Sequence, residues 1–224
     1  MTHSTFPSQP SILVLTGGTF GDRVGSLLRR SRAATVQSVD PHGTHPGFWP
    51  HADLVVLATG FERPRLAELV DRMAFHWDRS WFPVFATATT LVSGPVVVPG
   101  RTACYQCYTR RRDQHRGADD AGRPDVEFAQ PTPHVDIAVA LAEQSLDEVL
   151  HGGAATVRTF DQVSGGLSRS SVLAVNRCRR CRPKLEDEEN SELWQHLAAA
   201  AAQPAAAHPV AAHPAATPSE AVLR

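Results

Sequence analysis

The chain has 224 residues and a formal net charge of −1, from 22 lysines and arginines against 23 aspartates and glutamates. This length fits one domain with an appendage. The balanced charge excludes the general attraction to nucleic acid that a strongly basic chain has. No apolar run is long enough to cross a membrane, and no basic-then-apolar leader opens the sequence. A reducing cytoplasm is therefore the expected compartment, with neither membrane nor nucleic acid as a partner.

The first forty residues read as a strand, a glycine-rich turn, a helix and a second strand. The apolar run 12–16 leads into Gly18 and Gly21, and the apolar residues that follow repeat at helical spacing. A strand is expected over 34–39, with Asp40 at its end. An acid at this place in a nucleotide-binding fold usually binds a ribose hydroxyl. Gly18, Gly21 and Asp40 are therefore a candidate nucleotide site.

The glycine fingerprint of that candidate site is incomplete. In the register that uses Gly18 and Gly21, the position of the first glycine is taken by Thr16. Two interpretations follow, a bound nucleotide or a β-α-β unit that is purely architectural.

The remaining segments predict an α/β domain. Further strands are expected over 54–58, 81–88, 96–98, 155–161 and 171–176, and helices over 65–77 and 135–150. The unbroken apolar run 54–58 is typical of a buried parallel strand. The last two strands are expected to form a β-hairpin, and the polar stretch 113–133 an exposed loop. The order of elements favours a twisted, mainly parallel sheet with helices against it.

Four cysteines form two pairs with the same spacing, Cys104 with Cys107 and Cys178 with Cys181. Two C-x-x-C pairs are the usual ligand set of a structural tetrahedral Zn²⁺ site. Redox-active pairs or disulfides are the alternative, but nothing in the sequence marks an oxidising compartment. The sequence predicts a zinc ion that joins the late β-hairpin to an earlier segment. Four thiolates leave no open position on the metal, so its role would be structural.

The residues around the first cysteine pair resemble a known family. Residues 94–108, GPVVVPGRTACYQCY, and the arginines at 110–112 are similar to the zinc-knuckle region of ThiF-like proteins, which belong to the ubiquitin-activating-enzyme superfamily. This stretch of sequence is most similar to the branch that works with YcaO enzymes in making thiazole/oxazole-modified peptides, such as bacteriocins. The resemblance implies a Rossmann-like, ThiF-type sheet with helices, plus a C-terminal zinc-clamped β-hairpin.

Composition and resemblance together predict three parts of the chain. They are a disordered N-terminus at 1–10, a ThiF-like zinc-containing domain at 11–190, and a disordered Ala/Pro/His-rich tail at 191–224.

Adenylating members of this superfamily bind ATP through a complete glycine-rich turn, an acid after the second strand and a magnesium-binding acid after the third. Gly18, Gly21 and Asp40 fit this pattern, but Thr16 departs from it, and Gly60 falls where the magnesium-binding acid is expected. No lysine lies nearby to offset the phosphate charges. ATP is therefore not expected as a cofactor of this chain.

The resemblance implies a non-catalytic partner of a YcaO cyclodehydratase in azoline formation on a ribosomally made peptide. Relatives often carry an N-terminal winged-helix region that binds the leader peptide, and this chain reaches its first strand at once. The leader would then be bound through a separate peptide-binding module. Relatives also dimerise, so a homodimer is a further expected assembly.

Three other functions remain open from the sequence. The first is an active ATP-dependent adenylating enzyme of the ThiF/MoeB type. The second is a nicotinamide-dependent oxidoreductase, which rests only on Gly18, Gly21 and Asp40. The third is a zinc-based nucleic-acid binder that uses Arg110–Arg112 and Arg177–Arg182, but nearby acids offset their charge. In the favoured interpretation these arginines are exposed and meet a partner or an acidic leader peptide.

Overall fold

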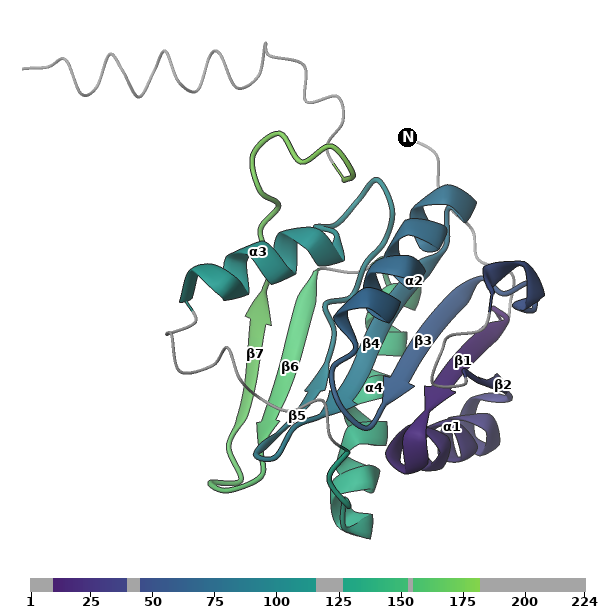
Figure 1. Cartoon of the computed structure of the whole chain (residues 1–224), viewed down its shortest axis with the longest axis vertical. Coiled ribbons are helices and arrows are strands. Elements are labelled where there is room, and N and C mark those ends of the chain that lie inside the picture. Colours follow the sequence, from purple (N-terminus) through teal and green to yellow (C-terminus); the bar gives the residue numbers. More distant parts are fainter. Residues whose placement is uncertain (1–9, 40–44, 116–126, 153–154, 182–224) are drawn as a thin grey trace, which may run out of the picture. The chain divides into compact units, whose positions relative to one another are not determined.

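The computed structural model describes residues 10–39, 45–115, 127–152 and 155–181 (Figure 1). In these ranges, seven strands form one sheet: β1 (Ile12–Gly17), β2 (Thr35–Ser38), β3 (Leu54–Thr59), β4 (Ser80–Ala86), β5 (Thr90–Ser93), β6 (Thr156–Asp161) and β7 (Leu167–Ser171). The helices are α1 (Gly18–Arg32), η1 (Pro46–Phe48), α2 (Pro64–Trp77), α3 (Tyr105–His115) and α4 (Thr132–Leu150).

The strands lie side by side in the order β2-β1-β3-β4-β5-β6-β7. Strands β1 to β4 are parallel, and β5, β6 and β7 are each antiparallel to the strand before them. Strand β6 therefore runs in the same direction as β1 to β4, so five of the seven strands share one direction. This is the mixed α/β fold with a mostly parallel sheet that the order of elements predicts. The β6–β7 hairpin is the edge of this same sheet.

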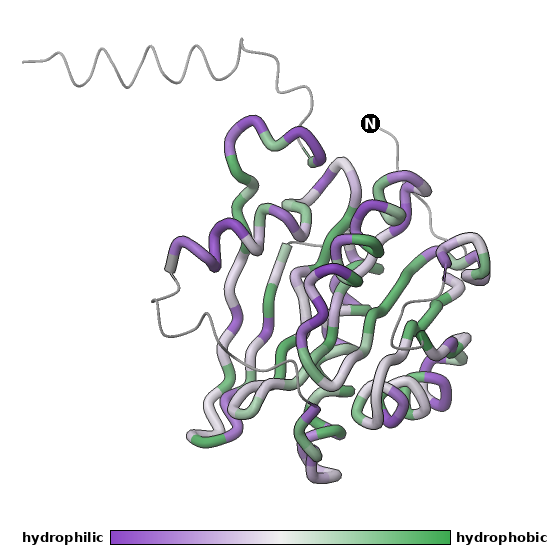
Figure 2. The backbone as a smooth tube through the Cα atoms, viewed as in Figure 1, coloured by the Kyte–Doolittle hydropathy of each residue, from purple (hydrophilic) through white to green (hydrophobic). Residues whose placement is uncertain are grey.

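Helices cover both faces of the sheet (Figure 1). One core joins α1 and α4 to the sheet, with Val24 and Leu146 fully buried in it. The other core lies on the opposite face and joins α2 to Trp81 and Tyr105, the first residue of α3. Figure 2 shows why the layers form, because the middle of the sheet is mostly hydrophobic while α3 turns hydrophilic toward its end. Burial of the apolar strands between two helical layers stabilises this arrangement.

The strand expected over 96–98 is wrong, because the chain forms β5 just before it. At Gly94 the backbone takes a φ of +108°, and a Cβ there would lie 2.3 Å from the carbonyl oxygen of Thr156. Pro95 follows and has no N–H to donate to a strand ladder. The chain therefore leaves the sheet at this point, and only one bridge, between Trp81 and Val97, remains of the expected strand.

The second strand of the hairpin was expected over 171–176 and lies instead at β7, Leu167–Ser171. The Asp161 carboxylate accepts hydrogen bonds from the amides of Val163 and Ser164, at 2.8 and 2.9 Å, and tightens the turn. Pairing with β6 therefore resumes earlier than expected. The apolar residues after β7 pack around the cysteines instead, which is why their hydrophobicity was misread as a strand.

The expected loop, the two terminal segments and the absence of a membrane span can be compared with only part of the structure. The stretch expected as a loop over 113–133 contains the end of α3 and the start of α4, and residues 116–126 lie outside the described residues. Most of the two predicted terminal segments, 1–10 and 191–224, lies outside them as well, so the three-part division stays a prediction. Among the helices that the structure describes, none is long and apolar enough to cross a membrane.

Candidate metal centre and nucleotide position

The four cysteines converge at one point of the fold. Their Sγ atoms all lie within 4.8 Å of one another. The closest pairs are Cys104–Cys107 and Cys104–Cys178 at 3.7 Å and Cys107–Cys181 at 3.6 Å. Zn–S bonds of about 2.3 Å in a tetrahedron place sulfur atoms about 3.8 Å apart. These three distances therefore match those of a tetrahedral S₄ set, and none of the four cysteines is in a disulfide.

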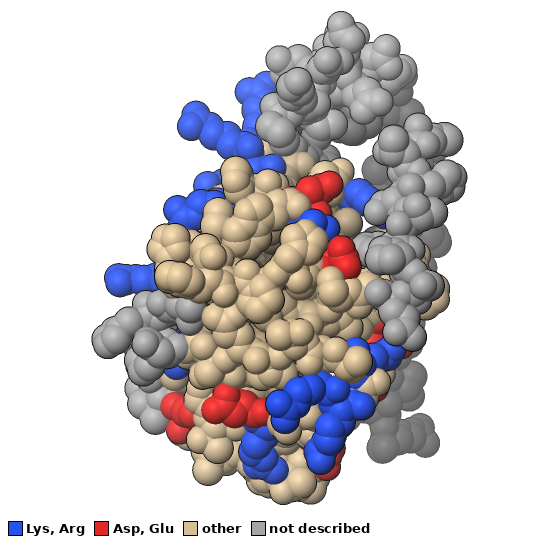
Figure 3. Space-filling view, turned by 90° about the vertical axis from the view of Figure 1, so that its right-hand side faces the viewer, with Lys and Arg blue, Asp and Glu red and all other residues tan. Residues whose placement is uncertain are grey.

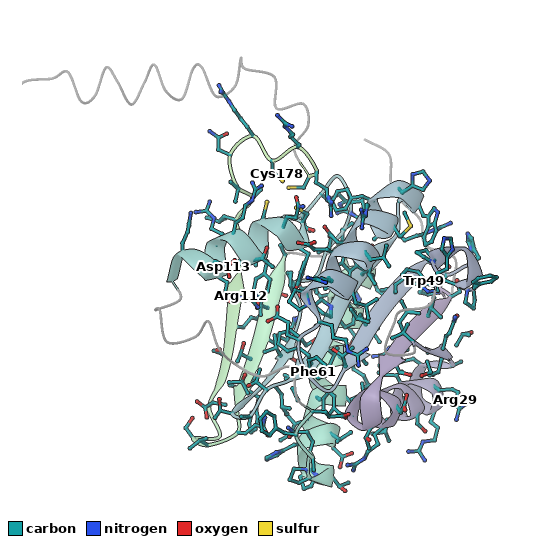
Figure 4. All side chains as sticks on the ribbon, viewed as in Figure 1. Arg29, Trp49, Phe61, Arg112, Asp113 and Cys178 are labelled. Atoms are coloured by element: carbon teal, nitrogen blue, oxygen red, sulfur yellow. The ribbon has the colours of Figure 1, made fainter. Side chains whose placement is uncertain are left out.

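Local structure brings each pair of cysteines onto one turn. Helix α3 begins directly after Cys104, and the amide of Cys107 donates to the Cys104 carbonyl at 3.0 Å. The second pair lies in the loop after β7, with Cys178 reaching toward α3 (Figure 4). The two pairs also touch through the backbone, since the Val175 amide donates to the Cys107 sulfur at 3.2 Å. An N–H aimed at sulfur favours the thiolate form that metals bind.

The protonation of the thiols agrees with a cation site. Hydrogen bonding with Cys181, followed by burial, raises the pKa of Cys104, and burial first of all raises the pKa of Cys107 to about 11. The hydrogen bond from Cys104 lowers the pKa of Cys181 to about 5. One thiolate is thus available at neutral pH, and a bound dication favours the charged form of the others. The cluster could hold a metal ion, and its soft S₄ donor set is compatible with zinc.

A buried aspartate, Asp71 on α2, links the two cysteine pairs. Its carboxylate is fully buried and accepts three hydrogen bonds, from the Tyr105 amide at 3.2 Å, the Trp81 indole at 3.0 Å and the Arg180 guanidinium at 2.5 Å. Tyr105 directly follows Cys104, and Arg180 directly precedes Cys181. One carboxylate therefore holds a backbone amide beside the first cysteine pair and a side chain beside the second.

The position of Asp71 in the apolar stripe of α2 is a signal that the sequence contains. Helix α2 buries Ala67, Val70, Asp71 and Ala74, which recur at helical spacing. A charged residue within such a buried stripe needs a partner, but its partner Arg180 lies more than a hundred residues later.

Among the described arginines of the two groups, Arg112 and Arg180 are half-buried, contrary to expectation, and the others are exposed as expected. Arg112 is half-buried, donates to Glu62 at 2.6 Å and lies over the Tyr108 ring at 5.0 Å (Figure 4). Arg111 donates to backbone carbonyls of the loop before the second cysteine pair, at 3.3 and 3.4 Å. Arg180 is held by Asp71. Figure 3 shows a different face, the one around α1 and β2, where blue and red side chains lie next to each other along the lower part of the surface.

Gly18 and Gly21 lie at the other end of the sheet from the cysteines. Gly18 begins α1 at the carboxyl end of β1, and a Cβ on Gly21 would lie 2.3 Å from the Ala58 carbonyl oxygen. Gly21 is therefore needed for the close approach of α1 to β3. Thr16 is buried and donates to Asp22 at 2.6 Å. Asp40 lies outside the described residues, so the structure does not place it beside the glycines.

The residues after β3 complete this edge of the sheet. Gly60 follows β3, and its amide donates to the Gly17 carbonyl at 3.2 Å. The Arg63 guanidinium lies beside Gly17 and 5.0 Å from the centre of the Phe61 ring. The side chain of Glu127 fills the space above Gly18 and Gly60, a contact that no spacing in the sequence indicated. Figure 4 shows Phe61 at this end of the sheet and Cys178 near the opposite end.

No family model matches the chain, and no curated protein matches it. Among solved structures, the fold is similar to a "heterocyclase in complex with substrate and cofactor", with a TM-score of 0.56 and 17% identity over 81% of this chain. It is also similar to the heterocyclase TruD, with a TM-score of 0.55 and 19% identity over 84% of this chain. The chain spans only 27% and 32% of those two proteins.

A third similar structure is the Escherichia coli microcin synthetase McbBCD complex. Its TM-score is 0.60 and its identity 12%, over 80% of this chain and 71% of the matched one. The microcin C7 biosynthetic enzyme MccB, in complex with N-formylated MccA, gives a TM-score of 0.57 and 14% identity over 76% of this chain and 67% of that one. At these identities the likeness shows a shared fold.

Proposed function

We propose that this chain is a non-catalytic, ThiF-like partner subunit of a YcaO-type cyclodehydratase, acting in azoline formation on a ribosomally made peptide. The observation that carries the proposal is the likeness of its fold to two heterocyclases and to a microcin synthetase complex. The ThiF-like sequence around Cys104 and Cys107 supports the same assignment.

A structural zinc ion held by the four cysteines is part of the proposal. Cys104, Cys107, Cys178 and Cys181 would supply four thiolates, and such a closed site activates no water. The metal would fix the loop after β7 against α3. A rigid body of this kind suits a subunit that positions other molecules rather than one that performs chemistry.

The proposal that this chain is not catalytic rests on the residues at the carboxyl ends of β1 and β3. Nucleotidyl transfer requires groups that offset several phosphate charges and bind a metal. Gly60 stands where an acid is expected, and Thr16 replaces a fingerprint glycine. ATP would therefore be used by the YcaO partner.

Reconstitution tests this function. The YcaO partner, the precursor peptide and ATP are incubated with and without this chain, and ring formation is followed by mass spectrometry as the loss of one water per ring. Rings are expected only, or much faster, when the chain is present. Equal rates without the chain would remove the partner role. Rings formed by this chain alone, without the YcaO protein, would make it the enzyme.

An adenylating enzyme is the second candidate, favoured by the likeness of the fold to MccB. ATP–pyrophosphate exchange in the presence of a peptide acid distinguishes the two. Exchange above the background of a Gly18→Trp variant, in which the indole would block the glycine-rich turn, supports adenylation. No exchange by the wild-type chain supports the partner role.

A further inference from the structure

The carboxylate of Glu127 lies at the start of α1. Its Oε1 accepts a hydrogen bond from the Phe20 amide at 2.6 Å. Phe20 is the third residue of α1, and the first four amides of a helix have no partner within the helix. Free amides and the helix dipole make this end of a helix attractive to anions. Here the anion is a side chain of the same polypeptide.

Glu127 also fills the room that two glycines leave open. A Cβ on Gly18 would lie 2.3 Å from Oε2 of Glu127, and a Cβ on Gly60 would lie 2.4 Å from its Cγ. Gly18 belongs to the turn after β1 and Gly60 to the turn after β3, so the side chain lies between the ends of two neighbouring strands. In open α/β sheets this crevice is where ligands bind.

The segment that carries Glu127 is fastened in place on its C-terminal side. Arg23 of α1 donates to the Gln130 carbonyl and to the Thr132 hydroxyl, both at 2.9 Å. Thr132 begins α4, which packs on α1 in the same core. Glu127 is also one wall of a cavity of about 250 Å³ that Phe20, Arg23 and residues 128–130 line. The carboxylate is therefore held at the glycines by the fold, and open space begins on its outer side.

A cation that would suit a phosphate is present next to this position. The Arg63 guanidinium lies against Gly17, and its Nε is buried with no hydrogen-bond partner in the part of the chain that the structure describes. Arg63 thus offers positive charge on one side of the crevice while the first amides of α1 offer it on the other.

We propose that Glu127 is an intramolecular phosphate surrogate that closes the nucleotide position of this fold. The carboxylate takes the amide hydrogen bond and the glycine-lined space that a phosphate group would need. A nucleotide phosphate can enter only if Glu127 leaves, and its negative charge repels the incoming group. This inference deepens the proposed non-catalytic role, and it rests on that role only for the conclusion that the wild-type chain needs no nucleotide.

The test compares three full-length chains, the wild type, E127A and E143A, in titrations with inorganic pyrophosphate and with Mg-ATP. Glu143 lies on α4 and is 4.0 Å from Arg32, near the other end of α1, so E143A removes the same charge away from the crevice. Amide NMR shifts of residues 18–20 report binding at the start of α1. We expect E127A to bind pyrophosphate at least tenfold more tightly than either other chain, with shifts at these amides.

The proposal is overturned if E127A binds no more tightly than E143A, or if the wild type binds equally well with shifts at the same amides. A measurement on the wild type covers the case in which E127A does not fold. Hydrogen exchange at the Phe20 amide should be at least tenfold slower than the intrinsic rate for its sequence, and an unprotected amide would also overturn the proposal. Both readouts use the isolated chain, so a failed reconstitution leaves their outcome unaffected.

Discussion

Replacement of Asp71 by asparagine should destabilise the metal centre from a distance. The variant keeps the shape of the side chain and one oxygen for the amide of Tyr105 and the indole of Trp81. It removes the charge that faces Arg180 and sets an amide group in the place of a carboxylate oxygen. The guanidinium of Arg180, next to Cys181, then has no carboxylate partner to hold it in place.

The magnitude follows from the burial of the pair. The Asp71 side chain is 0% exposed and that of Arg180 21%. Removing one partner of a buried ion pair costs about 3–5 kcal/mol, because the other charge is left uncompensated. Partial exposure lets Arg180 reach water, so the lower end, about 3 kcal/mol, is expected here. Desolvation raises the pKa of Asp71 in spite of its hydrogen bonds. The loss of stability in D71N therefore measures the effect of removing one charge, and not the net free energy that the ion pair contributes.

Urea unfolding at a fixed free zinc concentration measures this cost, followed by tryptophan fluorescence and far-ultraviolet circular dichroism. The zinc concentration must be constant because a ligand of the folded state adds to its stability. Release of zinc to a chromogenic chelator gives a second readout, and D71N should release the metal faster than the wild type.

Asp53 provides the matched control, since it is also an aspartate paired with an arginine. Its partner Arg79 lies at 3.2 Å, and the two side chains are 21% and 28% exposed. Pairs of this kind contribute about 0–1 kcal/mol, so D53N should lose no more than that and keep its zinc. If D71N and D53N lose the same free energy, the buried carboxylate does not organise the cysteines and the reasoning fails.

Two further predictions concern the metal and acid stability. Protein purified without chelator should contain one zinc per chain by elemental analysis, and Cys104→Ser should lose most of it and unfold at lower temperature; a zinc-free wild type, or an equally stable variant, would contradict this. Hydrogen bonds from the side chain and amide of Ser11, with the charge of Arg79, hold the pKa of Asp53 below its ordinary 3.8. A lowered pKa means that this contribution is present above pH 3.8 and is lost as the pH falls through the folded value. The difference in stability between wild type and D53N, about 0–1 kcal/mol at pH 6, should therefore shrink below pH 3.8, and a difference that is constant from pH 6 to pH 3 would contradict it.

The sequence predicted best the elements that an apolar run or an apolar helical stripe defines. Strand β3 was expected over 54–58 and forms at 54–59, and helix α2 was expected over 65–77 and forms at 64–77. Both elements are defined by their own apolar pattern, which burial between layers then stabilises. The convergence of the four cysteines was predicted from chemistry instead, because two C-x-x-C pairs are the usual ligand set of one tetrahedral metal site.

The misplaced elements depend on contacts that a linear pattern does not contain. Strand β7 is fully exposed along its length and carries only one apolar residue, so its place is set by pairing with β6 and not by burial. Helix α3 has a weak apolar stripe and is fixed by contacts at its first turn. The contacts of Asp71 and Glu127 were missed for the same reason, since their partners Arg180 and Phe20 lie 109 and 107 positions away in the sequence.

Helix α3 contacts both the cysteine cluster and the turn after β3. It spans only 11 residues, and a helix of that length is marginal in water without tertiary support. Cys104 and Cys107 fix its first turn. The Tyr105 hydroxyl and the Arg112 guanidinium both donate to Oε1 of Glu62, at 2.8 and 2.6 Å. Glu62 belongs to the turn after β3 that also carries Gly60 and faces Glu127. A metal bound by the cysteines would therefore support the turn beside Glu127 through the position of one helix.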